Sequence, residues 1–184
     1  MESNILHNQY DIYTHNVSTP GAAVSLQTCV FLWNLCNKLQ PKTLVDTGSG
    51  FSSYVFRRWA QPNNATVYSI DDNADWLARS KQFCEEQNVY TDNFLLFKDI
   101  VIIQKQTADL VLHDLGNRET RKQSLGIIYD LCKRGGTIVF DDMHKSDLRK
   151  HVSDFLIDKK LQHVDHSAET LDSFGRYCWS TVIT

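Results

Sequence analysis

Apolar residues recur along this 184-residue chain in two alternating patterns. Short and nearly continuous apolar runs are typical of strands covered on both faces, whereas apolar residues spaced three and four apart predict amphipathic helices. The runs predict strands over residues 43–46, 66–70, 93–97, 108–113, 137–140, 162–167 and 176–183. The helical spacing predicts helices over residues 20–39, 52–59, 74–88, 119–133 and 146–158.

Strands that alternate with helices predict an α/β fold, with a parallel sheet and right-handed crossovers. We expect a doubly wound, Rossmann-like sheet of seven strands, mostly parallel. No helix is predicted between the last two strands, so they form an antiparallel C-terminal hairpin at one edge. Residues 98–107 fit either a short helix or an extended run. Residues 1–18 form an arm, a short helix or a lid, and residues 19–184 form one domain.

The segment from the first to the second predicted strand carries the clearest chemical signal. The first strand ends in Asp46, the next turn contains Gly48 and Gly50, and the second strand ends in Asp71 and Asp72. Strand, glycine turn, helix, strand and acid, in this order, are typical of a nucleotide-binding unit. The glycines let the backbone approach a ligand closely, and an acid after the second strand can accept hydrogen bonds from two ribose hydroxyls.

The spacing of the glycines argues against a dinucleotide. A dinucleotide site has the pattern G-x-G-x-x-G, which places a pyrophosphate on the helix N-terminus. Here the turn reads D-x-G-x-G-F-S, without the third glycine, and Asp46 would repel phosphate but suits a cationic ligand. The turn resembles the first motif of the class I S-adenosylmethionine-dependent methyltransferases, and the resemblance extends over about residues 19–184.

The resemblance implies a cofactor site with assigned roles. By this resemblance, Asp46 lies near the methionine part of S-adenosylmethionine. Asp71 contacts the ribose, and Asp72 is the alternative for that role. Asp99 follows the strand after which enzymes of this family bind the adenine. Ser52 contacts the cofactor carboxylate or only caps its helix. Trp76 lies beside the adenine or, as we expect, in the helix core. The predicted cofactor-binding residues are Asp46, Gly48, Gly50, Ser52, Asp71, Asp72, Asp99 and Asp114.

Carboxylates also follow the fourth and fifth predicted strands, which are neighbours in this topology. Asp114, Asp141 and Asp142 make an oxygen-ligand set suited to Mg²⁺, and also to Mn²⁺ or Ca²⁺, unless they only cap the following helices. The stretches ADLVLHDLGN and GGTIVFDDMH resemble the metal-dependent small-molecule O-methyltransferases of the catechol and caffeoyl-coenzyme A group, including sugar and macrolide enzymes. The resemblance implies that the metal lowers the pKa of a substrate hydroxyl, whose oxygen then attacks the methyl group.

The general base departs from that pattern. Catechol-type enzymes have a lysine three residues after the first metal acid, and here Asn117 stands at that position. His144 is the expected catalytic base, because an imidazole titrates near neutrality. His113 is the second candidate, although as a strand-end residue it can instead point into the sheet packing.

The amino-acid composition argues against some classes of binding partner. A net charge of −3 and a pI of about 6.1 argue against a dedicated nucleic-acid binder. Five dispersed cysteines without C-x-x-C pairs indicate buried thiols in a reducing compartment, and no signal peptide or membrane-spanning run is visible. We expect a cytoplasmic protein with a small-molecule substrate and without nucleic-acid or membrane partners, and a homodimer is an open alternative to a monomer.

Three alternatives stay open. A metal-independent methyltransferase of a macromolecule would keep the cofactor motifs, although no N/D-P-P-Y motif of base methylation is present. A dinucleotide-dependent oxidoreductase fits the fold but not the glycine spacing. A non-catalytic S-adenosylmethionine-binding subunit would explain the missing lysine.

Overall fold

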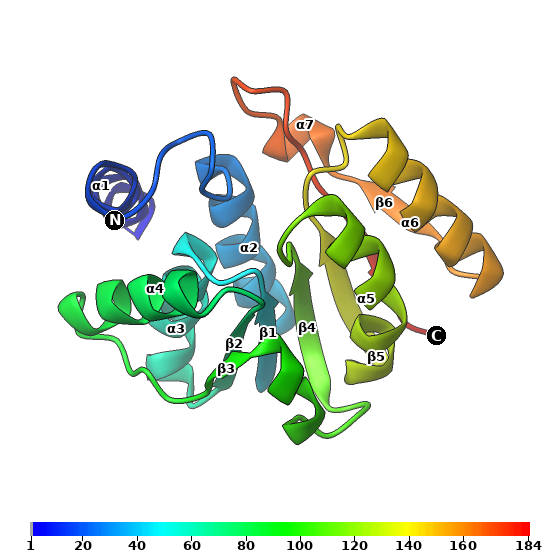
Figure 1. The fold of residues 1–184 in the computed structure, drawn as a ribbon, viewed down its shortest axis with the longest axis horizontal. Helices are drawn as coiled ribbons and strands as arrows, with labels where there is room; N and C mark the ends of the chain where they lie inside the picture. The colour runs from blue at the N-terminus through cyan, green and yellow to red at the C-terminus, as the bar shows by residue number, and fades with distance from the viewer. Residues whose placement is uncertain (1) are drawn as a thin grey trace.

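The structure is a computed structural model that describes residues 2–184 (Figure 1). Its strands form one sheet in the order β3-β2-β1-β4-β5-β7-β6. The strands are β1 Thr43–Thr47, β2 Thr66–Asp71, β3 Phe94–Leu96, β4 Ala108–His113, β5 Cys132–Phe140, β6 His163–Asp165 and β7 Trp179–Val182. The helices are α1 Glu2–Asn16, α2 Leu26–Leu39, α3 Phe51–Asn63, α4 Ala74–Glu86, the 3₁₀ helix η1 Phe97–Ile102, α5 Arg118–Leu131, α6 Ser146–Asp158 and α7 Ser167–Thr170.

The pairing confirms the predicted sheet. Strands β1 to β5 pair in parallel, whereas β7 is antiparallel to both of its neighbours, β5 and β6. Strand order reverses between β1 and β4, and in open α/β sheets ligands bind outside the carboxyl ends of the strands at such a point.

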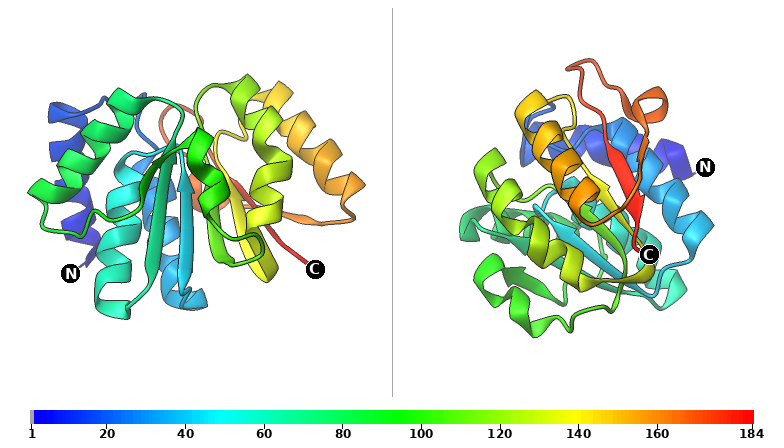
Figure 2. Two further views of the ribbon diagram at one scale, coloured as in Figure 1. Left: turned by 60° about the horizontal axis from the view of Figure 1, so that its bottom comes forward. Right: turned by 90° about the vertical axis from the view of Figure 1, so that its right-hand side faces the viewer.

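Alternate residues of a strand point to opposite faces of the sheet. Because apolar side chains lie on both faces, helices cover each of them. On one face Val45 and Val111 pack with Leu125 of α5 and Leu148 of α6. On the other face Leu44, Val67 and Leu110 pack with apolar residues of α2 and α3. Figure 2 shows the sheet between these two helical layers. This double covering explains why the strands read as continuous apolar runs.

Helix α1 resolves the open question about the N-terminal segment. Leu6, Tyr10 and Tyr13 are buried against Phe51 of α3 and Phe83 of α4. The ring centroids of Tyr13 and Phe83 are 5.0 Å apart in an edge-to-face arrangement. The segment is therefore a helix that packs on the core.

Several predicted boundaries are wrong for local reasons. Helix α2 begins at Leu26 instead of Pro20, because Ser25 caps it by accepting a hydrogen bond from the Thr28 amide at 3.0 Å. The preceding residues are then free to form a loop. Helix α3 continues through Pro62 to Asn63, and Asn64 ends it in the left-handed conformation with φ of 50°.

Strand β5 also starts earlier than expected, at Cys132, and the glycine pair 135–136 lies within it. A Cβ on Gly136 would lie 2.7 Å from the Cys132 sulfur, so the close packing explains a glycine there. The undecided run after β3 begins as the 3₁₀ helix η1. All five cysteines are buried free thiols, as expected. Within residues 2–184, no helix has both the length and the apolar character to cross a bilayer.

Candidate active site

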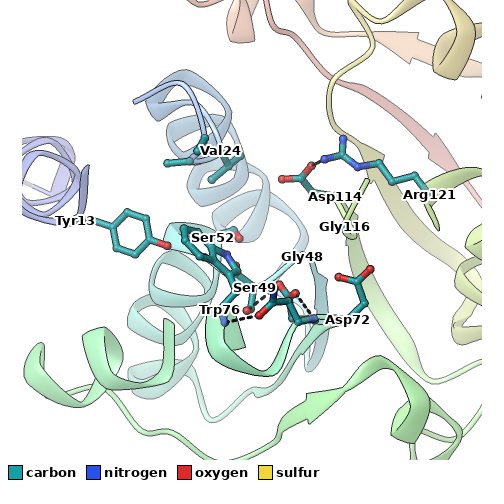
Figure 3. A pocket seen from close by; sticks show the side chains of 15 residues that line it. Tyr13, Val24, Gly48, Ser49, Ser52, Asp72, Trp76, Asp114, Gly116 and Arg121 are labelled. Carbon is teal, nitrogen blue, oxygen red and sulfur yellow. Dashed lines mark hydrogen bonds and ion pairs between the residues drawn. The ribbon is translucent and has the colours of Figure 1, made fainter. Parts of the chain in front are cut away.

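A pocket of about 390 Å³ opens at the carboxyl ends of β1, β2 and β4 (Figure 3). It is lined by the glycine turn after β1, the acids at the end of β2, the turn after β4, residues of α1, α3, α4 and α5, and the loop before α2. These lining residues are Tyr13, Ala22, Ala23, Val24, Gly48, Ser49, Gly50, Ser52, Asp71, Asp72, Asn73, Trp76, Asp114, Gly116 and Arg121. Gly48, Gly50, Ser52, Asp71, Asp72 and Asp114, predicted from sequence, therefore meet at one cavity.

The glycine turn is held by close backbone contacts. Gly48 has φ of 95°, and its amide donates to the Ile70 carbonyl at 2.8 Å. A Cβ on Gly48 would overlap with the carbonyl oxygen of Asp114. The amide of Asp114 donates in turn to the Thr47 carbonyl at 2.8 Å. Only glycine fits this crossing, which fixes the turns after β1 and β4 against each other.

Asp46 lies beneath this turn and is completely buried. Its carboxylate accepts hydrogen bonds from Ser52 Oγ at 3.0 Å and Ser53 Oγ at 2.5 Å, both in the first turn of α3. Burial raises the pKa of Asp46 to about 7. Asp46 does not line the cavity, so the observed contacts give it a role in holding α3, and its contact with a cofactor stays a prediction.

The two acids after β2 have different surroundings. Asp71 accepts from the Asn73 amide at 2.9 Å and from Ser49 Oγ at 3.1 Å, and burial raises its pKa. The carboxylate of Asp72 faces Gly116, where a Cβ would collide with it. Asp71 therefore also shapes the glycine turn, while Asp72 reaches across the mouth of the cavity toward the turn after β4 (Figure 3).

Two aromatic residues complete the wall. The indole of Trp76 donates to the Ser49 carbonyl at 2.6 Å and lines the cavity, so the expected place in the helix core is wrong. The ring of Tyr13 comes from α1, and its hydroxyl points toward the glycine turn (Figure 3). Sequence reasoning missed Tyr13, although Leu6, Tyr10 and Tyr13 have the four- and three-residue spacing of one helical face.

A second cavity of about 370 Å³ adjoins the first and is lined by the acids after β4 and β5. Asp114, Asp141 and Asp142 each have a carboxylate oxygen, and these three oxygens lie within 4.8 Å of one another. Asp141 Oδ1 is buried without a hydrogen-bond partner. Burial, and then the charges of Asp114 and Asp142, raise the pKa of Asp141 well above its usual value.

Two cations that sequence reasoning missed lie in this acid cluster. Arg121 of α5 forms ion pairs with Asp114 and, at 2.7 Å, with Asp142. Lys145 Nζ lies 2.5 Å from the same Asp142 oxygen. Burial would raise the pKa of Asp142, but Arg121 and Lys145 hold it below its usual value. The pKa of Asp114 is still raised to about 6, because burial outweighs the guanidinium.

The histidines differ in position. His144 lines the second cavity, with Nδ1 3.5 Å from Asp142 Oδ1, and burial lowers its pKa. His113 is buried with Nε2 3.0 Å from the Arg121 carbonyl oxygen, and burial lowers its pKa to about 4. His113 therefore ties β4 to α5. Asn117, at the lysine position, caps α5 by accepting from the amides of Glu119 and Thr120.

Asp99, predicted to bind the cofactor, lies in η1 and is half-buried. It does not line either of these cavities. Its contact with an adenine stays a prediction.

The chain shares this fold with solved methyltransferases. The chain is similar to the O-methyltransferase TomG of Streptomyces achromogenes, involved in tomaymycin synthesis and solved with S-adenosylmethionine, at 15% identity and a TM-score of 0.70, covering 100% of this chain and 88% of TomG. It is also similar to the methyltransferase PaMTH1 of Podospora anserina, solved with S-adenosylhomocysteine, at 13% identity and a TM-score of 0.76, with 97% and 87% covered.

A third similar structure is an O-methyltransferase from Bacillus cereus, also with S-adenosylhomocysteine, at 13% identity and a TM-score of 0.72, with 96% and 90% covered. At these identities the likeness establishes the fold. Neither a protein-family model nor any curated protein matches the sequence.

Proposed function

We propose that the protein transfers the methyl group of S-adenosylmethionine to a hydroxyl of a small molecule. The observation that carries this proposal is the shared wall of the two cavities: Asp114 and Arg121 line both. A cofactor in the first cavity would thus adjoin an acceptor in the second. The solved O-methyltransferases of the same fold, with S-adenosylmethionine or S-adenosylhomocysteine bound, support this assignment.

The first cavity has the chemistry that the cofactor needs. Its floor is the glycine turn, its acids can accept hydrogen bonds from ribose hydroxyls, and the indole of Trp76 offers a flat surface for a purine. Acids at the rim suit a sulfonium and a ribose better than the pyrophosphate of NAD. We therefore propose that Asp71 and Asp72 contact the ribose.

A divalent metal fits the acid cluster in donor type. The three carboxylates supply the oxygen ligands that Mg²⁺ prefers. In addition, Asp141 Oδ1 is buried without a hydrogen-bond partner, and a bound cation would satisfy it. Asp114, Asp141 and Asp142 would hold the ion. When bound, it would lower the pKa of a substrate hydroxyl.

His144 is the proposed base. Its lowered pKa leaves the imidazole neutral at pH 7, and a neutral imidazole can accept the hydroxyl proton. The oxygen then attacks the methyl carbon as the carbon–sulfur bond breaks, which leaves S-adenosylhomocysteine. The position of His144 at the second cavity, beside Asp142, supports this role.

A metal-independent methyltransferase is the second candidate. Arg121 and Lys145 already neutralise part of the acid cluster, which favours a site that works without an ion. Its acceptor would be a macromolecule if the open second cavity admits one.

The test is transfer of a radiolabelled methyl group to a panel of catechols, sugars and other hydroxylated small molecules, with and without EDTA. Labelled ether products that EDTA suppresses would support the metal-assisted reaction. Products that persist in EDTA would favour the second candidate. Absence of any product, from these acceptors or from protein and nucleic acid, would contradict the enzymatic proposal.

A further inference from the structure

Two cationic side chains, Arg121 and Lys145, lie in the acid cluster formed by Asp114, Asp141 and Asp142. The guanidinium of Arg121 bridges Asp114, after β4, and Asp142, after β5, and its side chain is only 9% exposed. Lys145 Nζ contacts the same Asp142 oxygen that Arg121 Nη1 contacts, at 2.5 Å and 2.7 Å. Asp142 Oδ2 is therefore engaged by two donors at once.

The charges of the carboxylates, Arg121 and Lys145 determine how strongly a divalent ion would be attracted to this cluster. Even if all three carboxylates are ionised, the two cations leave only one net negative charge. A divalent ion placed among the carboxylates would also lie within a few ångströms of both cations, where like charges repel strongly in a buried site. Arginine, lysine and the ion therefore cannot share these oxygens.

The Arg121 side chain can leave without disturbing its backbone. Its amide donates to the Asn117 carbonyl at 3.0 Å, and its own carbonyl oxygen is contacted by His113 Nε2 at 3.0 Å. Nε of the guanidinium has no hydrogen-bond partner, so only the terminal nitrogens hold the group in place. Cavities border the side chain on two sides and give it room to rotate.

We propose that Arg121 and Lys145 are built-in counter-ions that compete with a divalent metal for Asp114 and Asp142, so that the ion binds only when they withdraw. This inference rests on the proposed metal-assisted function. Asp141, with its unpartnered oxygen, is the carboxylate that is free to meet the ion first. The device makes the metal affinity of the site weaker than that of a bare carboxylate triad.

Binding of Mn²⁺ to the full chain, followed by the electron paramagnetic resonance signal of the free ion, tests the proposal. The variants are Arg121→Met and Lys145→Met, each of which removes one cation and keeps an unbranched side chain. Arg118→Met is the matched control, because Arg118 pairs with Asp147 outside the cluster and is 57% exposed. We expect Mn²⁺ to bind Arg121→Met at least tenfold and Lys145→Met at least threefold more tightly than wild type, and Arg118→Met as wild type does.

Equal or weaker Mn²⁺ binding by the folded variants, or no binding by any of them, would overturn the proposal. If Arg121→Met does not fold, Lys145→Met decides the question, because Lys145 is half-exposed and its removal leaves the Arg121 bridge in place. The same samples are tested for S-adenosylhomocysteine binding. If wild type binds S-adenosylhomocysteine but the variants do not bind Mn²⁺ more tightly, only this inference is refuted. If wild type does not bind S-adenosylhomocysteine, the proposed function is refuted.

Discussion

Gly48 lies against the backbone of Asp114 so closely that a Cβ at residue 48 would overlap with the Asp114 carbonyl oxygen. This crossing joins the turn after β1 to the turn after β4, the two turns that form the floor of the first cavity. Position 48 therefore requires glycine for two reasons: its φ is 95°, and there is no room for a side chain.

Gly48→Ala should therefore destabilise the fold and damage the cofactor site together. We expect a loss of roughly 3 kcal/mol in the free energy of unfolding, from backbone strain and overpacking. Urea denaturation measures the loss. The control is Gly126→Ala on the exposed face of α5, where nothing lies within 4 Å of an added Cβ, and which should be neutral or stabilising by up to about 1 kcal/mol. Equal effects of the two substitutions would contradict the account.

Asp71→Ala and Asp72→Ala should separate the two acids after β2. Both should weaken binding of S-adenosylhomocysteine about tenfold or more, because in the proposed complex each would lose charge-assisted hydrogen bonds to the ribose. Only Asp71→Ala should also lower the melting temperature of the ligand-free protein, since Asp71 accepts bonds from Asn73 and Ser49. Calorimetric titration and thermal melts give the two quantities. Unchanged affinity in Asp71→Ala would remove it from the cofactor site.

Asp141→Ala should leave S-adenosylhomocysteine affinity nearly unchanged, because Asp141 does not line the first cavity. It should abolish the turnover that EDTA suppresses, since it removes a carboxylate whose buried Oδ1 has no hydrogen-bond partner, whereas Asp114 Oδ1 is ion-paired with Arg121. The measurement is methyl transfer to an acceptor found in the panel, with and without EDTA. If neither the substitution nor EDTA changes turnover, metal assistance is excluded.

His144→Ala should reduce methyl transfer by about 100-fold or more while both ligands still bind, as expected for loss of a general base. Because burial lowers the pKa of His144, wild-type activity should rise as pH increases through a pKa below the usual value of an imidazole. The variant should lack this acid limb. His151→Ala, on the exposed face of α6, is the control. Unaltered turnover in His144→Ala would rule it out as the base.

His113 should make stability depend on pH. Its pKa is lowered to about 4, so the folded state resists protonation, and the stability it contributes is present above about pH 6.5 and lost as pH falls toward 4. Between pH 7 and pH 4.5 the wild type should lose roughly 2 kcal/mol more than His113→Gln, whose amide can still donate to the Arg121 carbonyl. Urea denaturation at the two pH values gives the difference, and parallel losses in both proteins would contradict it.

The glycine turn and the strand-end acids were predictable, because they depend on local chain geometry and on the order of strands and helices. Strand 108–113 has the predicted bounds, since its central residues 110–112 form a buried apolar run. Arg121 was not predictable, because its entry into the acid cluster depends on how α5 rotates against β4 and β5. The loop before α2 was missed because Thr19-Pro20 has the residues of a helix start, whereas the N-cap forms at Ser25, further along the chain.

Binding of S-adenosylhomocysteine tests the central claim most directly. A thermal melt compares the protein alone, with S-adenosylhomocysteine and with NAD, each with and without Mg²⁺. At 100 times its dissociation constant the cofactor product should add about 2.7 kcal/mol, which raises the melting temperature of a chain of this size by about 5–10 °C. NAD should have no effect. A shift with NAD alone, or with neither ligand, would contradict the assignment of the glycine turn and of the active site built on it.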